Sequence, residues 1–173
     1  GENALDQLNG DIHFPCIVKP QFIHEFKKHY SNKKVFVVNN IDELRENLSN
    51  VHQKKIGAVI QEIVTGKDRD QFSIAVYMNE NYQPLWYFSA RKVRQQPITF
   101  GTGTLVVNEQ NTFLKNTAIN FLKAIKFRGL AEVEFRKDQI DGKYKLIEIN
   151  PRAWSQNSLA TSCGVNIIYN MYQ

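Results

Sequence analysis

The chain of 173 residues is 42% hydrophobic and 23% charged, as is ordinary for a soluble globular protein with one domain or two small ones. It has no apolar run of about 18 residues, the length of a membrane span, and no visible signal peptide, so we expect a cytoplasmic protein. The net charge of +5 suits an anionic ligand. Because the positive charges are scattered and do not alternate with aromatic residues, we expect no nucleic acid partner.

The N-terminal part of the sequence is expected to contain a linker, a strand and a loop. The chain begins without an initiator Met, which indicates an excised piece, and residues 1–13 are predicted to be a linker or an upstream helix. Residues 14–20 predict a short apolar strand that ends at a proline. Lys19, at the end of this strand, is either a solubilising cap or a point charge directed at a phosphate. Residues 21–34 have no regular period and are predicted to be a loop.

Most of the remaining elements follow from hydrophobic periodicity. Strands are expected at residues 35–38, 58–64, 72–78 and 85–93, and helices at residues 40–50, 113–127, 153–163 and 165–172. Asn40 and Glu43 resemble a capping box at the start of the first helix. The polar bend at residues 67–71 is predicted to separate two lobes. Cys16 and Cys163 lack a disulfide or metal spacing and are expected to be reduced thiols in the core.

A cluster of basic residues follows the strand at residues 85–93. Arg91 and Arg94 lie beside a Gly- and Thr-rich bend at residues 99–104. Guanidinium groups close to exposed backbone N–H groups make a good receptor for an anion. A basic surface loop is an equally good interpretation of these residues alone.

The most informative stretch is residues 129–152, which alternation predicts to be two strands joined by a tight turn. In the first strand Glu132, Glu134 and Arg136 share one face. In the second strand the four residues on one face are expected to be Tyr144, Leu146, Glu148 and Asn150.

The turn sets the register of this hairpin. A two-residue turn at Asp141-Gly142 would mix the faces, whereas a three-residue loop with Gly142 in the left-handed conformation keeps them consistent. The three-residue loop pairs Glu134 with Glu148, so that the roots of two carboxylates lie only about 5 Å apart.

Opposed carboxylates need a positive charge between them. Glu134, Glu148 and Asn150 offer two carboxylates and an amide oxygen, which are hard ligands suited to Mg²⁺. The alternative is that these side chains are solvated charges on an exposed hairpin. Three oxygen ligands on one face, followed at once by Pro151 and Arg152, favour the metal site.

Five motifs, taken in order along the chain, resemble one known family. They are FPCIVKP, AVIQEIVTG, ARKVRQ with GTGT, AEVEF and LIEINPR. This set resembles the ATP-grasp superfamily, and within it the carboxylate–amine ligase branch that includes D-aspartate ligase-like and carbamoyl-phosphate-synthase-like members. The resemblance covers residues 14–173 and implies an α+β fold in which two lobes with antiparallel sheets clasp a nucleotide. It places the small lobe at residues 14–66 and the large lobe at residues 67–173.

The resemblance also implies roles for individual residues. Lys19 would contact the α- and β-phosphates of ATP, Asp70 the ribose hydroxyls, and the adenine would be held by Gln61, Glu62 and the backbone of Ile63. Mg²⁺ would be held by Glu134, Glu148 and Asn150. The γ-phosphate and the substrate carboxylate would be bound by Arg152 and by Arg91 or Arg94.

The activity implied is activation of a carboxylate as an acyl phosphate, which an amine then attacks. The substrates would be small-molecule or cell-envelope carboxylates and amines. The alternative is a nucleotide-binding module that no longer catalyses, although such a module need not keep a metal clamp.

The sequence departs from this family in two respects. Residues 21–34, where many ATP-grasp enzymes carry a glycine-rich phosphate loop, contain no glycine. Either Lys33 or Lys34 with the backbone replaces that loop, or the loop is disordered without nucleotide. An N-terminal domain of about 100 residues, usual in these enzymes, is also expected to be missing.

Overall fold

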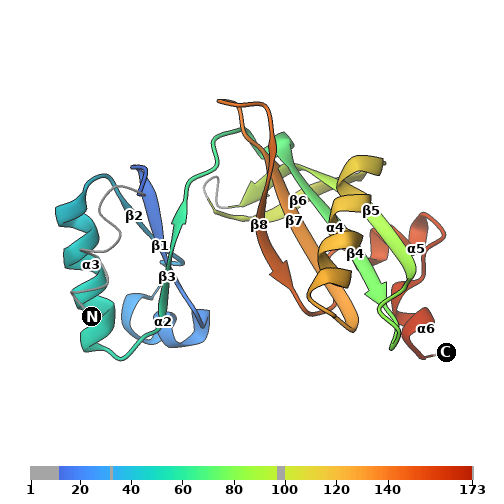
Figure 1. The fold of residues 1–173 in the computed structure, drawn as a ribbon, viewed down its shortest axis with the longest axis horizontal. Helices are drawn as coiled ribbons and strands as arrows, with labels where there is room; N and C mark the ends of the chain where they lie inside the picture. The colour runs from blue at the N-terminus through green and yellow to red at the C-terminus, as the bar shows by residue number, and fades with distance from the viewer. Residues whose placement is uncertain (1–11, 32, 97–99, 173) are drawn as a thin grey trace. The chain divides into compact units, whose positions relative to one another are not determined.

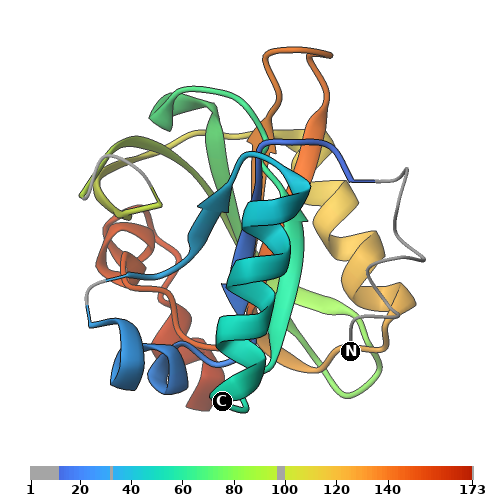
Figure 2. The same cartoon turned by 90° about the vertical axis from the view of Figure 1, so that its left-hand side faces the viewer.

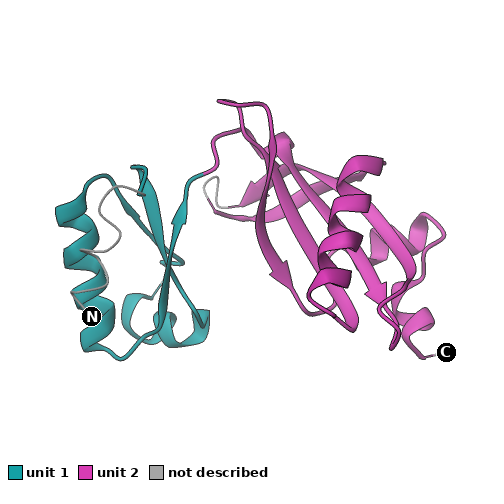
Figure 3. Cartoon of the chain, in the orientation of Figure 1, with its two compact units in different colours: residues 1–63 teal, residues 64–173 magenta. Residues whose placement is uncertain are grey.

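A computed structural model describes residues 12–31, 33–96 and 100–172. The chain forms two compact units, Gly1–Ile63 and Val64–Gln173 (Figure 3), whereas the sequence analysis put the division after Gly66. Most of the linker predicted at residues 1–13 lies outside the described residues, as does the start of the bend predicted at residues 99–104. No helix in the described part of the chain is long and apolar enough to cross a membrane. Of the two cysteines expected in the core, Cys16 is buried, whereas Cys163 is exposed.

Unit 1 is a three-stranded antiparallel sheet with helices (Figure 1). Its elements are β1 (Cys16–Pro20), α2 (Ile23–Tyr30), β2 (Phe36–Val38), α3 (Ile41–Gln53) and β3 (Ala58–Glu62). The strand order is β2-β1-β3. Helix α3 lies along one face of this sheet (Figures 1 and 2), where its Leu44 packs against Cys16, Val18 and Val38. As predicted, the side chain of Asn40 caps α3 by accepting a hydrogen bond from the backbone N–H of Glu43.

The prediction of a loop at residues 21–34 is wrong, because helix α2 occupies most of this segment. The helix is short and has no side-chain cap, but its Phe26 is fully buried against Val51 and Ile56. Tertiary burial of this one aromatic ring outweighs the weak local helix signal. Helix α2 therefore lies in the segment where the family resemblance implied a phosphate loop.

Unit 2 is a five-stranded antiparallel sheet with helices on both faces. The strand order is β6-β5-β4-β7-β8. Its elements are the 3₁₀ turn η1 (Asp68–Asp70), β4 (Gln71–Met78), β5 (Pro84–Gln96), β6 (Thr102–Asn108), α4 (Thr112–Ala124), β7 (Gly129–Lys137), β8 (Tyr144–Asn150), α5 (Asn157–Ser162) and α6 (Ile167–Tyr172). The expected α+β class with antiparallel sheets is confirmed. Residues 102–104, which were expected to belong to a Gly- and Thr-rich bend, form instead the start of the edge strand β6.

The two faces of the large sheet bury different cores. On one face α4 packs through Leu114, Ala118 and Leu122 onto alternate residues of β4 and β7. On the other face Trp154 packs against Phe88 and covers only part of the sheet, together with residues of α5 and α6. The uncovered remainder of this second face carries the polar residues of interest, and we call it the carboxylate face.

The pairing predicted for the β7–β8 hairpin is confirmed, but the turn that produces it is not the one expected. Glu134 lies opposite Glu148, and Glu132 lies opposite Asn150. The backbone N–H of Asp138 bonds to the carbonyl of Lys143, so the loop has four residues rather than three. A bulge between Glu134 and Phe135 then restores the expected register.

The bulge also changes which side chains of β8 share a face. Before it, Tyr144 packs with the α4 core and makes an edge-on contact with Phe72. After it, Glu148 and Asn150 lie on the carboxylate face. The prediction that Tyr144 shares a face with Glu148 is therefore wrong, because an inserted residue reverses the alternation of the strand.

Candidate functional site

Three acidic side chains on the carboxylate face converge on one amide. The Nδ2 atom of Asn150 donates to Oε1 of Glu134 and to Oε1 of Glu148, each at 3.1 Å, and to Oε2 of Glu132 at 3.4 Å. Arg152 donates to Oδ1 of the same Asn150 at 3.3 Å. The hairpin register causes this convergence, since opposed residues of antiparallel strands share a face. The structure therefore brings together all three predicted metal ligands and Arg152.

Glu132 is the most buried of these acids, with 6% of its surface exposed. Burial, and next the neighbouring Glu134 carboxylate, raise the pKa of Glu132 to about 7. A hydrogen bond from Ser73 and the charge of Arg152 act in the opposite direction. The raised pKa therefore reflects mainly the loss of hydration around this carboxylate, to which the charge of Glu134 adds.

Lys92 on β5 is a cation close enough to these acids to interact with the charges of Glu134 and Glu132. Burial lowers the pKa of Lys92, while the charges of Glu134 and Glu132 partly restore it. Its Nζ atom donates to the Gly101 carbonyl and to Oε1 of Gln95, each at 3.4 Å. The sequence analysis gave Lys92 no role, although it lies between the two arginines that were considered.

Gln71 and Arg136 complete the carboxylate face beside Glu134. Nε2 of Gln71 donates to Oε2 of Glu134. Arg136 lies directly opposite Gln71 in the β4–β7 register and two residues beyond Glu134 on β7. The sequence analysis placed Arg136 on this face but gave it no function, and Gln71 was missed.

The structure does not bring Arg91 or Arg94 into the cluster. Arg91 lies opposite Phe72, whose side chain belongs to the α4 core, so Arg91 is on the other face of the sheet. There its Nε atom pairs with Oε2 of Glu109 at 2.5 Å. Arg94 is exposed on β5, where a register shift separates it from Lys92.

The residues expected to meet the nucleotide base and its first phosphates lie in unit 1. Lys19 is opposite Val59, and Gln61 is opposite Ile17, so these four residues share the face of the sheet that α3 does not cover. Glu62 is opposite Cys16, on the alternate side of the sheet. Ile63 follows directly after β3.

Asp70 belongs to unit 2 and already has two hydrogen-bond donors. Its Oδ2 atom accepts from the backbone N–H of Lys67 at 2.6 Å and from Nε2 of Gln139 at 2.9 Å. These bonds close the η1 turn and connect it to the β7–β8 loop. Asp70 therefore stabilises the η1 turn, in addition to the contact with the ribose expected from the sequence.

Among the described residues, no three carboxylate, imidazole or thiolate side chains are placed to hold a cation by themselves. The donor set expected from the sequence contains the amide of Asn150 beside the carboxylates of Glu134 and Glu148. Two carboxylates and an amide oxygen are a donor set that fits Mg²⁺, which takes hard oxygen ligands and fills its remaining positions with water and phosphate oxygens.

The comparisons with known proteins identify the family of this chain. Residues 2–173 match the family described as carbamoyl-phosphate synthase L chain, ATP binding domain. The chain belongs to this family, within the ATP-grasp superfamily. It is thus an ATP-binding domain of the ATP-grasp type, as the motifs indicated.

Three relatives illustrate the range of this superfamily. The ATP-grasp domain is 26% identical over 160 residues to D-aspartate ligase of Enterococcus faecium, covering 89% of this chain and 38% of the ligase. Its fold resembles biotin carboxylase of Campylobacter jejuni, with a TM-score of 0.68, 18% identity, and coverage of 99% of this chain and 39% of that one. It also resembles the biotin carboxylase domain of Hydrogenobacter thermophilus 2-oxoglutarate carboxylase, solved with MgADP and bicarbonate. That likeness has a TM-score of 0.68, 14% identity, and coverage of 97% and 38%.

Proposed function

We propose that this chain is the ATP-binding part of a ligase that activates a carboxylate as an acyl phosphate for attack by an amine. The observation that carries the proposal is the convergence of Glu134 and Glu148 on the amide of Asn150, beside Arg152. Such a cluster is unfavourable in a protein that binds no cation, because like charges repel. The chain spans 38% of the D-aspartate ligase it matches, so the activity proposed is that of the whole protein.

In the proposed site Glu134, Glu148 and Asn150 hold Mg²⁺. When bound, the ion neutralises charge on the phosphate oxygens of ATP. The protein's part is to keep the two carboxylates opposite each other on adjacent strands and to supply the amide oxygen. In the structure that amide donates to both carboxylates through Nδ2, and it would turn to present Oδ1 to a cation. The MgADP complex of the Hydrogenobacter thermophilus domain supports this choice of ion.

Unit 1 is proposed to bind the adenine and the first two phosphates through the face of its sheet that α3 leaves uncovered. Val37 and Val59 on this face are 46% and 54% exposed, which gives a flat base an apolar surface on which to lie. Lys19 shares this face and supplies a point charge for the α- and β-phosphates. Gln61 shares the same face and offers its side-chain amide to the base.

The end of β3 and the turn that follows complete the nucleotide contacts in this proposal. Glu62 belongs to the other side of the sheet, but it is the exposed last residue of β3, so its carboxylate reaches past the strand end to accept a hydrogen bond from the exocyclic amine of the adenine. The backbone of Ile63 bonds to the ring. The ribose hydroxyls meet Asp70 through Oδ1, the oxygen that takes no part in its bonds to Lys67 and Gln139.

Arg152 and Lys92 are proposed to bind the γ-phosphate and the substrate carboxylate. Both are cations close to the acidic cluster, and positive charge offsets the repulsion between two anions that must react. Lys92 takes the place first given to Arg91, which is held by Glu109 on the other face. Arg94 is exposed and is proposed as a peripheral contact for the acid.

The proposed reaction has two steps. A carboxylate oxygen of the acid bonds to the γ-phosphorus while the bond from that phosphorus to ADP breaks. The amine nitrogen then bonds to the acyl carbon, phosphate leaves, and the amine gives up its proton. Because both steps develop charge on phosphate oxygens, fixed cations lower the barrier without covalent attachment to a side chain.

The experiment that tests this proposal compares nucleotide binding with product release. We expect isothermal titration calorimetry to show ATP binding that requires Mg²⁺, and Glu148→Gln to weaken it by more than tenfold. Glu80→Gln, in the exposed turn before β5, is the matched control and is expected to change nothing. Absence of Mg²⁺-dependent ATP binding would refute the proposal.

A second candidate function is a nucleotide-binding module without catalysis. The full-length protein decides between the two when it is incubated with ATP, Mg²⁺ and a panel of amino acids and other carboxylic acids. We expect release of ADP and phosphate that depends on one acid and one amine. ATP binding without such release from any pair would favour the non-catalytic module.

A further inference from the structure

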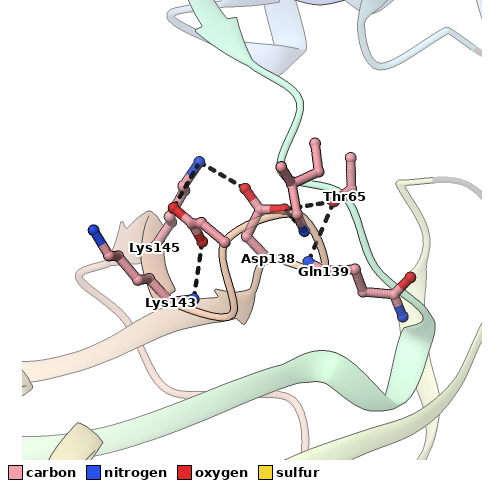
Figure 4. A network of polar contacts seen from close by, with 7 residues as sticks. Thr65, Asp138, Gln139, Lys143 and Lys145 are labelled. Atoms are coloured by element: carbon pink, nitrogen blue, oxygen red, sulfur yellow. Dashed lines mark hydrogen bonds and ion pairs between the residues drawn. The ribbon is translucent and has the colours of Figure 1, made fainter.

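The tip of the β7–β8 hairpin holds the chain segment that follows β3. We call residues 64–70 the connecting segment. The hydroxyl of Thr65 donates to Oδ1 of Asp138 at 2.5 Å and accepts from the backbone N–H of Gln139 at 3.3 Å (Figure 4). Gln139 also donates through Nε2 to Asp70. Near both of its ends, the connecting segment is thus hydrogen-bonded to hairpin residues more than sixty positions away in the sequence.

Asp138 is the centre of this network. Only 3% of its surface is exposed, and it accepts hydrogen bonds from the hydroxyl of Thr65 and the backbone N–H of Ile140. Nζ of Lys145 pairs with its other oxygen at 2.6 Å. Lys145, and then the bonds from Thr65 and Ile140, hold the pKa of Asp138 well below its usual range. The carboxylate is therefore charged, and both of its oxygens bond within this network.

The connecting segment also approaches the hairpin backbone closely at Gly66. The Gly66 carbonyl accepts a hydrogen bond from Nη2 of Arg136 at 2.6 Å. A Cβ atom on Gly66 would lie 3.0 Å from the carbonyl oxygen of Lys137 and 3.3 Å from Nε of Arg136, and the φ angle of 145° is one that other residues rarely adopt. The glycine thus allows the segment to lie directly against β7.

We infer that Asp138 and Thr65 are positioning residues for nucleotide binding, because they fix the chain immediately after the residues proposed to hold the adenine. This inference rests on the proposed function. Thr65 is two residues beyond Ile63, so at most about 7 Å of extended chain separates the fastened hydroxyl from the proposed adenine contact. Apart from η1 the connecting segment has no regular secondary structure, so it is held by these side-chain bonds together with the burial of Val64.

The expected effect of these bonds on ATP affinity follows from conformational entropy. A binding segment that is already ordered loses less freedom when the ligand arrives, so that more of the contact energy appears as affinity. Releasing Thr65 should weaken ATP binding by about fivefold, within the usual range of coupling between two sites in one protein.

The test uses a matched pair of substitutions at one position. Thr65→Val keeps the shape of the side chain and removes the hydroxyl, whereas Thr65→Ser keeps the hydroxyl. Asp141→Asn is the control for the hairpin, because Asp141 bonds to Lys143 and Lys145 within the hairpin and not to the connecting segment. Each protein is measured by hydrogen exchange of the peptides covering residues 62–70, by calorimetry with ATP and Mg²⁺, and by thermal unfolding.

We expect Thr65→Val to speed exchange in residues 64–67 and to weaken ATP binding about fivefold, with Thr65→Ser and Asp141→Asn close to the parent chain. Unchanged exchange or unchanged ATP affinity in Thr65→Val would overturn the inference, and so would a change confined to thermal stability. Absence of ATP binding by the parent chain would refute the proposed function itself, and with it the nucleotide role of the hairpin tip. If the parent chain binds ATP and Thr65→Val binds it equally well, only the inference fails.

Discussion

Replacing Glu132 by Gln should stabilise the metal-free protein at high pH and leave it unchanged at low pH. The pKa of Glu132 is raised to about 7 from its ordinary value of 4.5, chiefly by burial and by Glu134. A raised carboxylate pKa means that the folded state prefers the protonated acid. The stability that the folded protein has with Glu132 protonated is therefore fully present below about pH 4.5, and it is lost as the pH rises to about 7.

The difference between these two pKa values corresponds to about 3 kcal/mol in the free energy of unfolding. Glu132→Gln removes the charge and keeps the shape, so the variant should be more stable than the parent by about 3 kcal/mol at pH 8. The difference should shrink to nearly zero at pH 4.5. Urea denaturation in the presence of a chelator, repeated at several pH values, measures it, and Glu80→Gln serves as the control.

A difference between Glu132→Gln and the parent that does not vary with pH would refute this reasoning. So would a variant that is less stable than the parent at pH 8. Either result would mean that the folded protein compensates the Glu132 charge far better than its burial and neighbours indicate.

Three further outcomes are expected. Glu132→Gln should change Mg²⁺-dependent ATP affinity by less than about threefold, because Glu132 lies beside the proposed ligand set and not in it; calorimetry showing a loss as large as that of Glu148→Gln would contradict this set. Lys92→Met should weaken ATP binding by about tenfold without lowering the thermal midpoint, because burial already disfavours its ammonium group; an unchanged affinity would remove Lys92 from the site. Leu122→Ala should lower the free energy of unfolding by about 2–5 kcal/mol, because this α4 side chain is fully buried; a loss of under about 1 kcal/mol in urea titrations would contradict the packing described.

The hairpin shows how much of the site could be predicted from the sequence. Alternation and the need for consistent faces were sufficient to pair Glu134 with Glu148. The same argument could not foresee a four-residue loop and a compensating bulge, because two errors of one residue cancel in the register. Between the loop and the bulge the predicted alternation is still wrong, so the side chain of Tyr144 lies on the other face from the one predicted.

Two predictions, the loop at residues 21–34 and the place of Arg91 in the site, failed because tertiary structure decides both. Helix α2 has a weak local signal and forms around the burial of Phe26, which single-residue propensities do not reveal. Arg91 resembled an anion-binding residue beside a flexible bend, yet its place opposite Phe72 turns it away from the acids. The register of β4 with β5 was the missing information, and with it the alternation would have selected Lys92.

The fastening of the connecting segment had no sequence signal. Thr65 and Asp138 are 73 residues apart, and each is an ordinary polar residue that follows a strand. Only the fold shows that the hairpin tip and the segment after β3 meet within unit 2. Sequence patterns report local periodicity well, whereas single hydrogen bonds between distant segments leave no periodic trace.

The claim on which the account depends is that the amide of Asn150 faces a divalent ion bound with the nucleotide. Titrating the ¹⁵N-labelled chain with ATP and paramagnetic Mn²⁺ in place of Mg²⁺ tests it directly. We predict that the side-chain amide signals of Asn150 broaden and disappear at low ratios of metal to protein, before signals of residues on the α4 face. Sharp Asn150 signals under conditions in which ATP and Mn²⁺ are bound would contradict the account.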